Sequence, residues 1–150
     1  MTWLARHSAA IQALAAAVTA VVALAALVGV KLQLDAAEAT QARQSAREAY
    51  RAHLTLSIGR PDLAAPRDAC ALADGPDGTA YDAFLDHLLY SAEQMLDTQP
   101  GWEATFAAAL QPHARVLCRD PAAVQSGAPG LDALLAGFVA RVCPGVDPCP

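Results

Sequence analysis

Aromatic and charged residues are scarce in this sequence, at 5% and 17% of the chain. It contains no H-E-x-x-H or C-x-x-C pair, no G-x-S-x-G elbow and no glycine-rich phosphate loop, so the patterns that mark zinc hydrolases, thiol redox motifs, serine hydrolases and nucleotide-binding proteins are missing. Sustained alternation of apolar and polar residues, which is typical of strands, is also missing. These absences predict an all-α protein that is not an enzyme and uses no cofactor.

Clusters of basic residues are missing from the C-terminal part of the chain. Residues 59–150 hold five Lys or Arg against twelve Asp or Glu, a net charge of −7. Phosphate contacts need clustered Lys and Arg, so we expect no nucleic acid among the partners.

What the chain does contain is one long apolar stretch, Ala9–Val30, without charge or proline. At 1.5 Å per helical residue it extends about 33 Å, enough to cross a hydrocarbon core of roughly 30 Å. We therefore expect a short tail at residues 1–8 and a single transmembrane helix at residues 9–30, in contact with the lipid bilayer. A cleaved signal peptide has a shorter apolar region with its cleavage site close behind, and a soluble domain of this size would struggle to cover such a helix on every side.

Small residues four apart in this stretch suggest how two spans pack. The pairs Ala13/Ala17 and Ala25/Gly29 allow close approach of helix backbones. They are the candidate helix–helix contacts, either with other membrane protein subunits or with a second copy of the chain.

The helical pattern continues beyond the span. Residues 31–58 contain no Pro or Gly and are rich in strong helix formers, so the transmembrane helix is expected to continue as a long juxtamembrane helix ending at Ile58. Apolar residues then recur three and four apart in 79–96 and 130–142. Between them, Pro112 is expected to kink a helix that opens near Trp102.

The expected domain is a small distal helical bundle at residues 59–143, followed by a frayed tail rich in Pro and Cys at 144–150. Each helix has one apolar stripe, and at least three stripes must meet to exclude water. We expect the stripe of the second helix to pack on the juxtamembrane helix, with the last helix closing the other side. The stripe of the second helix consists of Phe84, Leu85, Leu88 and Leu89, which should contact Tyr50, Leu54 and Ile58 of the juxtamembrane helix. The last helix contributes Leu134, Leu135 and Phe138.

Two patterns disagree on orientation. Lys31, Arg43 and Arg47 follow the span and only Arg6 precedes it, which by the positive-inside rule places the C-terminal domain in the cytoplasm. This is the orientation we expect.

The four cysteines favour the opposite side, because disulfides form in oxidising compartments. If the domain lies outside the cytoplasm, Cys143 and Cys149 are candidates for a small disulfide ring at the end of the chain.

Other polar residues are expected to have ordinary roles. His53, His87 and His113 fall on different predicted helices and lack metal-ligand spacing, so we expect no metal site. The acidic residues of the second helix are expected to form a solvated face: Asp82, Asp86, Glu93 and Asp97.

The order of these motifs resembles a broad group of short bacterial single-pass membrane proteins of unknown function. The resemblance covers residues 10–118 and is carried by the segments 47–54, 60–64 and 84–94 and by Trp102. It implies an all-helical, cytoplasmic domain attached to a bacterial inner (plasma) membrane. It implies no activity and no catalytic residue.

The sequence therefore predicts a non-enzymatic, membrane-anchored helical accessory or interaction protein, such as a small subunit that binds or stabilises a larger membrane complex. The alternative is a small membrane-bound enzyme or a redox or metal protein that uses the His and Cys residues.

Overall fold

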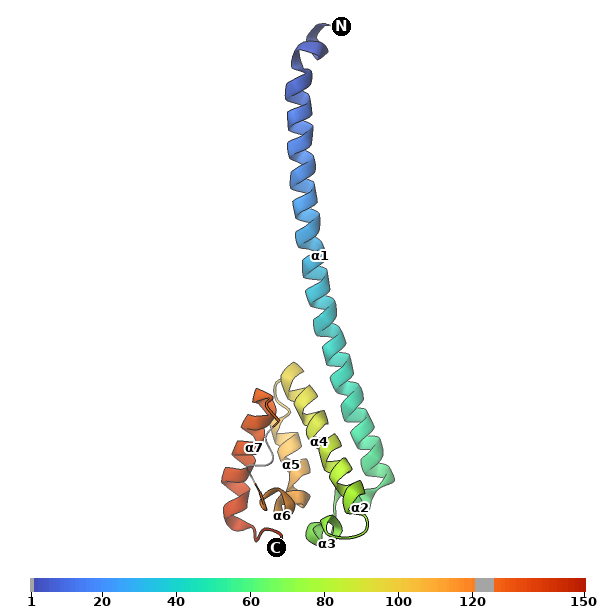
Figure 1. Cartoon of the computed structure of the whole chain (residues 1–150), viewed down its shortest axis with the longest axis vertical. Helices are drawn as coiled ribbons and strands as arrows, with labels where there is room; N and C mark the ends of the chain where they lie inside the picture. The colour runs from blue at the N-terminus through green and yellow to red at the C-terminus, as the bar shows by residue number, and fades with distance from the viewer. Residues whose placement is uncertain (1, 121–125) are drawn as a thin grey trace. The chain divides into compact units, whose positions relative to one another are not determined.

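The computed structural model describes residues 2–120 and 126–150 (Figure 1). These residues form helices joined by turns and contain no strand, which confirms the all-α prediction. The chain divides into two compact units, residues 1–40 and 41–150. The second unit therefore begins well before the predicted boundary at residue 59, because part of the first helix belongs to its core.

Helix α1 is continuous over Thr2–Gly59. The prediction that one unbroken helix runs from the apolar stretch to Ile58 is confirmed. The helix also includes residues 2–8, which the sequence predicts as a short tail, because no Pro or Gly interrupts it there. The helix ends one residue after Ile58. Gly59 does not favour continuation, and Pro61 opens a new helix as its first residue.

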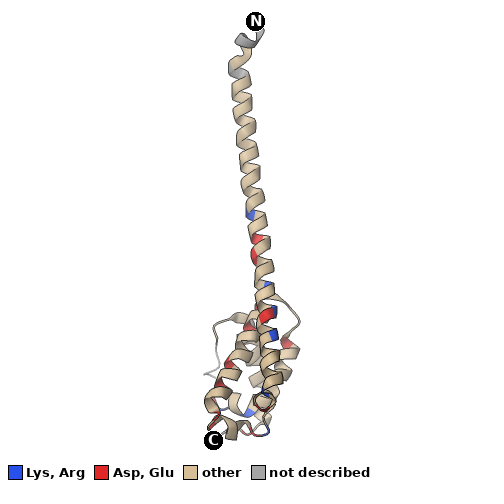
Figure 2. Ribbon diagram, turned by 90° about the vertical axis from the view of Figure 1, so that its right-hand side faces the viewer, with Lys and Arg blue, Asp and Glu red and all other residues tan. Residues whose placement is uncertain are grey.

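The 1–40 unit carries the one stretch in the described part of the chain that is long and apolar enough to cross a membrane. Its aliphatic side chains are exposed, with Leu14 at 67% and Leu27 at 68%. The Thr19 hydroxyl donates to the Ala15 carbonyl at 2.9 Å, so the helix itself satisfies this polar side chain, as an apolar surrounding requires. Between its grey N-terminal end and the first blue residue, α1 is drawn in Figure 2 without charged residues.

The 41–150 unit is a small helical bundle. After α1, its longer helices are α4 (Gly78–Thr98), α5 (Glu103–Leu110) and α7 (Pro129–Val142). The shorter elements are α2 (Pro61–Ala64), α3 (Ala69–Ala73), η1 (Gln111–His113), α6 (Ala114–Leu117) and η2 (Cys143–Gly145). Pro112 lies in the 3₁₀ turn η1 that separates α5 from α6, so the expected break at this proline is confirmed.

Helix α4 starts where the chain is too crowded for a side chain. A Cβ at Gly78 would overlap the carbonyl oxygen of Ala73 at the end of α3, so only glycine fits without a backbone shift. This close approach brings α3 against the first turns of α4, where Leu63 and Ala69 join Tyr81, Phe84 and Leu85 in a cluster of buried residues.

The larger core lies between α4, α5, α6, α7 and the last part of α1. Its most buried large side chains include Leu88, Met95, Phe106 and Phe138, each at most 1% exposed. The predicted packing of α4 and α7 is therefore confirmed for Leu88, Leu134, Leu135 and Phe138, which all lie in this core.

The face that α1 turns toward the core differs from the one predicted. Tyr50 packs against the core as expected, but Leu54 and Ile58 are 42% and 82% exposed. Ala46 and His53 are buried instead. The Ser91 hydroxyl donates to the Ala49 carbonyl at 3.2 Å and links α4 to this face. Close helix packing favours the small Ala46, and this rotates Leu54 and Ile58 away from the core.

The end of the chain is ordered, so the prediction of a frayed tail is wrong. Cys149 is only 4% exposed, and its backbone N–H donates to the Arg115 carbonyl at 3.0 Å. The tail therefore belongs to the bundle.

Candidate functional site

A groove runs along the outer side of α4, where it meets α6 and α7. Its volume is about 490 Å³. Leucines form its floor, and among its lining residues Asp82, Asp86 and Tyr90 are exposed to solvent; the leucines are Leu85, Leu89, Leu117, Leu131 and Leu135. Tyr90, at 54%, is one of the most exposed aromatic side chains of the described residues. The groove thus combines an apolar floor with a polar rim, as protein-binding surfaces do.

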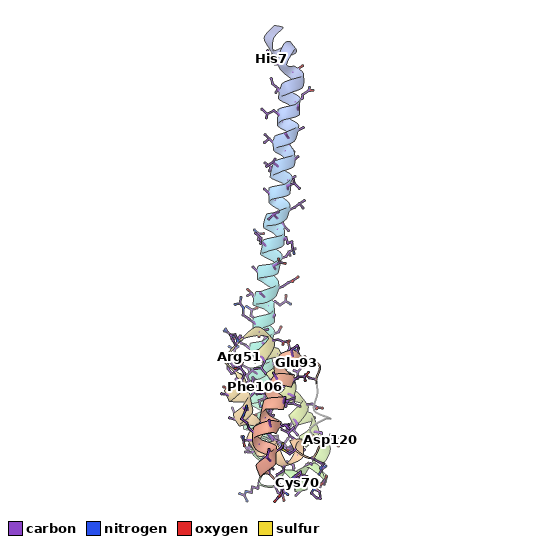
Figure 3. All side chains as sticks on the ribbon, turned by 90° about the vertical axis from the view of Figure 1, so that its left-hand side faces the viewer. His7, Arg51, Cys70, Glu93, Phe106 and Asp120 are labelled. Carbon is purple, nitrogen blue, oxygen red and sulfur yellow. A yellow bond between two sulfur atoms is a disulfide. The ribbon has the colours of Figure 1, made fainter. Side chains whose placement is uncertain are left out.

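The rim is acidic. Asp82, Asp86 and Glu93 come from α4, and Asp120 lies across the groove (Glu93 and Asp120 are labelled in Figure 3). Arg119 also lines the groove, but its guanidinium is engaged by the Asp74 carboxylate at 3.1 Å. The predicted solvated face is therefore confirmed for Asp82 and Asp86, and the structure adds that these carboxylates border an apolar groove.

All four cysteines are paired, and not in the predicted way. Cys70 is bonded to Cys149, with Cα atoms 5.4 Å apart, and Cys118 is bonded to Cys143, with Cα atoms 5.5 Å apart. The predicted ring between Cys143 and Cys149 is therefore wrong. Cys143 follows the end of α7 beside Cys118, whereas the next six residues carry Cys149 to α3.

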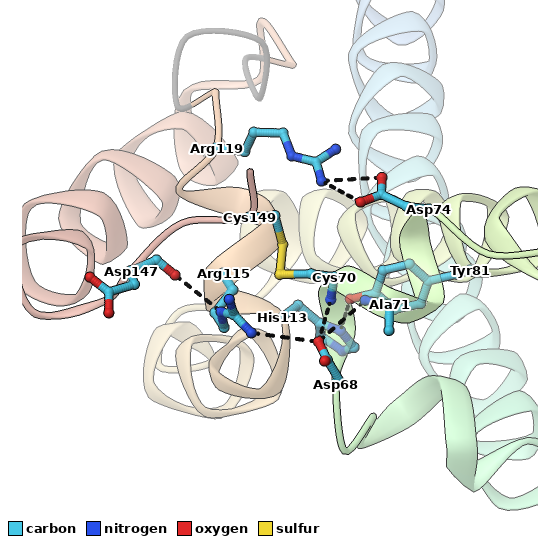
Figure 4. The surroundings of a disulfide bond; sticks show 10 residues. All are labelled: Asp68, Cys70, Ala71, Asp74, Tyr81, His113, Arg115, Arg119, Asp147 and Cys149. Atoms are coloured by element: carbon cyan, nitrogen blue, oxygen red, sulfur yellow. Dashed lines mark hydrogen bonds and ion pairs between the residues drawn. A yellow bond between two sulfur atoms is a disulfide. The ribbon is translucent and has the colours of Figure 1, made fainter.

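The Cys70–Cys149 disulfide lies in a small polar network (Figure 4). Asp68 caps α3 by accepting hydrogen bonds from the backbone N–H groups of Cys70 and Ala71, at 3.1 and 3.2 Å. Arg115 pairs with Asp68 at 3.5 Å and donates to the Asp147 carbonyl at 3.1 Å. The disulfide and the arginine together hold α3, α6 and the end of the chain. Because no thiol is free, the cysteines offer neither a nucleophile nor a thiolate ligand.

Three histidines from different elements gather around Phe84. The ring centroid of His53 lies 5.1 Å from that of Phe84 and 6.0 Å from that of His87, and the ring of His113 lies 6.0 Å from Phe84. Sequence reasoning placed them on separate helices but had no means of bringing them together. In the described part of the chain, no group of three His, Cys, Asp or Glu residues is arranged to hold a metal ion.

Two of these histidines are held neutral by their surroundings. Burial, and secondarily the nearby His53, lowers the pKa of His113 to about 4. Burial, and secondarily His87, also lowers the pKa of His53 below its ordinary 6.5. The His113 Nδ1 atom lies 2.8 Å from the Tyr81 hydroxyl, whose own pKa is raised by burial and by the charge of Asp82. This Tyr–His pair joins α4 to η1 inside the core, and sequence spacing gave no sign of it.

Three aromatic side chains form a continuous cluster between α1 and α5. The ring of Tyr50 makes edge contacts with Trp102 and Phe106, at centroid distances of 5.0 and 5.6 Å. Phe106 is fully buried, so these residues join α1 to α5. We assign them to packing, because their rings contact one another and join two helices.

The candidate membrane contacts are all on the surface of α1. Ala13, Ala17 and Ala25 are exposed, and a Cβ added at Gly29 would meet nothing within 4 Å. At 100° per residue the two pairs lie about 120° apart around the helix, so they belong to two different faces. Neither pair packs against another helix of the described residues, so packing within the chain does not account for the small residues at these positions.

In comparisons with known proteins, no protein family, curated protein or solved structure matches this chain.

Proposed function

We propose that the chain is a non-enzymatic interaction protein, anchored by α1 in the inner membrane of a bacterium, whose 41–150 unit binds another membrane protein. The observation that carries this proposal is the acidic groove on α4. Five leucines line its floor beside exposed carboxylates; four of them are only 2–6% exposed, and Leu89 is half-buried. The groove suits a helix or extended segment that presents apolar residues together with Lys or Arg.

Charge complementarity defines the partner segment. Asp82 and Asp86 are four residues apart and Glu93 follows seven residues, or two turns, later, so all three lie on one face of α4 along one edge of the groove. A partner with basic residues at the same spacing would pair with all three. Such pairing accelerates and orients binding, while Tyr90 and Leu89 contribute affinity through burial of their remaining exposed surface.

We further propose that the 41–150 unit lies outside the cytoplasm, opposite to the orientation expected from Lys31, Arg43 and Arg47. Two disulfides that pair every cysteine favour an oxidising compartment. The charge asymmetry carries less weight. Arg43 and Arg47 belong to the folded unit that begins at residue 41, where Arg47 donates to the Gln99 side chain at 3.4 Å. Charges within folded domains that are translocated have little influence on orientation.

Site-specific photo-crosslinking tests the binding proposal. A photoreactive phenylalanine replaces Tyr90 in the groove and, as a matched control, Ala140, which is exposed on α7 and lines no part of the groove. In native membranes we expect a discrete crosslinked protein from position 90 and none from position 140. Neutralising Asp82, Asp86 and Glu93 as amides should weaken that crosslink, as should added salt.

Two outcomes contradict the proposal. One is crosslinking that is the same at both positions. The other is a position-90 product that is insensitive to removal of the three carboxylates. Reporter fusions at the C terminus test the orientation separately: a periplasm-dependent reporter should be active there, and activity of a cytoplasm-dependent reporter would restore the cytoplasmic orientation.

A further inference from the structure

A second, smaller cavity lies inside the 41–150 unit, between the last turns of α1, α4 and the α5–η1 segment. Its volume is about 200 Å³, several times the roughly 30 Å³ of one water and below the range of drug-sized pockets. The cavity is lined mainly by apolar and aromatic side chains, including Tyr50, Phe84, Leu88 and Phe106. No Asp, Glu, Lys or Arg is among the described residues that line it. It therefore suits one small, uncharged molecule.

Two imidazoles interrupt this apolar lining. His53 Nδ1 and His113 Nε2 are buried, and neither has a hydrogen-bond partner. Both residues line the cavity, and they are 6% and 0% exposed. A buried polar atom without a partner is costly, and a leucine would fill the same space without that cost. Packing alone does not explain why histidines stand at both positions.

The neighbours of the two rings define what each nitrogen offers. The Ser57 hydroxyl donates to the His53 carbonyl at 2.9 Å, which leaves its oxygen to accept from His53 Nε2–H at 3.4 Å. We therefore assign a lone pair to His53 Nδ1. Burial keeps the Tyr81 hydroxyl protonated, so it donates to His113 Nδ1, and His113 Nε2 carries a hydrogen. The cavity thus offers one acceptor and one donor.

A hydroxyl group matches this pair, because it donates one hydrogen bond and accepts another. We propose that the cavity binds a small neutral molecule with an apolar ring or branched chain and one hydroxyl, which donates to His53 Nδ1 and accepts from His113 Nε2. Both nitrogens are covered in the unliganded chain, so the proposal requires the two rings to turn slightly toward the cavity while keeping their contacts with Ser57 and Tyr81. This site is separate from the acidic groove and goes beyond the proposed partner binding.

Phenol and toluene are matched probes, since toluene carries a methyl group of similar size in place of the hydroxyl of phenol. The full chain, labelled with ¹⁵N-histidine and held in detergent micelles, is titrated with each probe at neutral pH. The readout is the ¹⁵N NMR signals of the His53 and His113 rings, because micelles also take up both probes. We expect phenol to shift both signals saturably and to bind at least about tenfold more tightly than toluene, the ratio that one hydrogen bond commonly supplies.

A pair of variants on α1 locates the binding. Leu54 lines the cavity and Leu56 does not, yet the two side chains are 42% and 43% exposed, so tryptophan is tolerable at either position. Leu54→Trp should block the cavity and weaken phenol binding at least about tenfold, whereas Leu56→Trp should leave it unchanged. The proposal is overturned if phenol shifts neither ring, if toluene binds as tightly as phenol, or if the two variants bind phenol alike.

Discussion

The Cys70–Cys149 disulfide should be the strongest single covalent contribution to the stability of the bundle. Its cysteines are 79 residues apart, and the Cys118–Cys143 bridge, which spans 25 residues, lies within that loop. The inner bridge shortens the outer loop to roughly 55 residues, so the loss of chain entropy on closing it amounts to about 4 kcal/mol in the unfolded state. Closing the inner loop of 25 residues alone corresponds to a loss of chain entropy of about 3.5 kcal/mol in the unfolded state.

The test compares the wild-type chain with the double variant Cys70→Ser, Cys149→Ser. Thermal unfolding of the full chain in detergent is followed by near-UV circular dichroism, which reports on the packed rings of Tyr50 and Trp102. For a domain of this size 1 kcal/mol corresponds to roughly 4 °C, so we expect the melting temperature to fall by about 16 °C.

Reductant provides the matched control. Reduction should lower the melting temperature of the wild-type chain further than that of the variant, because the wild type loses both bridges and the variant only one. A variant that melts within about 4 °C of the wild type, roughly 1 kcal/mol, would contradict the structural role given to this bridge. Peptide mapping that found Cys143 bonded to Cys149 would contradict the pairing itself.

Three further outcomes follow from burial, titration and the surface of α1. Leu88→Ala, at a side chain only 1% exposed, should lower the free energy of unfolding measured in urea by about 2–5 kcal/mol. Ile58→Ala, at a side chain 82% exposed, should change this free energy little. The pKa of His113 is lowered to about 4 in the folded chain, so protonation of this residue favours the unfolded chain. Its neutral form should therefore contribute fully to the free energy of unfolding above pH 6.5, and that free energy should fall by about 3 kcal/mol as the pH drops to 4. His113→Gln should reduce this dependence on pH. If the span self-associates through Gly29, Gly29→Leu should lower dimer yield in a membrane two-hybrid assay, and an unchanged yield would exclude this face, since nothing in the chain packs there.

The helices were predictable because their causes are local. No Pro or Gly interrupts residues 31–58, so α1 is continuous there, and Pro112 breaks the later helix because it lacks an N–H and crowds the preceding turn. The stripe of α4 was likewise predictable, since three- and four-residue spacing places Leu88 and its neighbours on one face. Each of these features depends on residues within a few turns of one another.

The missed features depend on how the elements meet. Spacing places His53, Leu54 and Ile58 on one broad face of α1 and does not decide which of them enters the core. The structure buries the histidine, beside Phe84 and close to Ser57, where a small helix face at Ala46 allows close packing. The cysteine pairing was equally out of reach, because four cysteines allow three pairings and only the fold decides which Cα atoms come within bridging distance.

The groove shows how a candidate binding surface depends on an arrangement of helices that sequence patterning leaves undetermined. Helix α4 has leucines on one face and carboxylates on the next, and this pattern was visible from the start. Whether the boundary between the two faces is covered depends on the helices beside it. In the structure α6 and α7 supply Leu117, Leu131 and Leu135 to the groove but leave Asp82 and Asp86 in solvent, so that the boundary is open. The same leucine stripe therefore belongs both to the core and to the floor of the proposed binding surface, so mutations of the exposed Tyr90 or the carboxylates should affect the proposed binding without affecting the stability of the bundle.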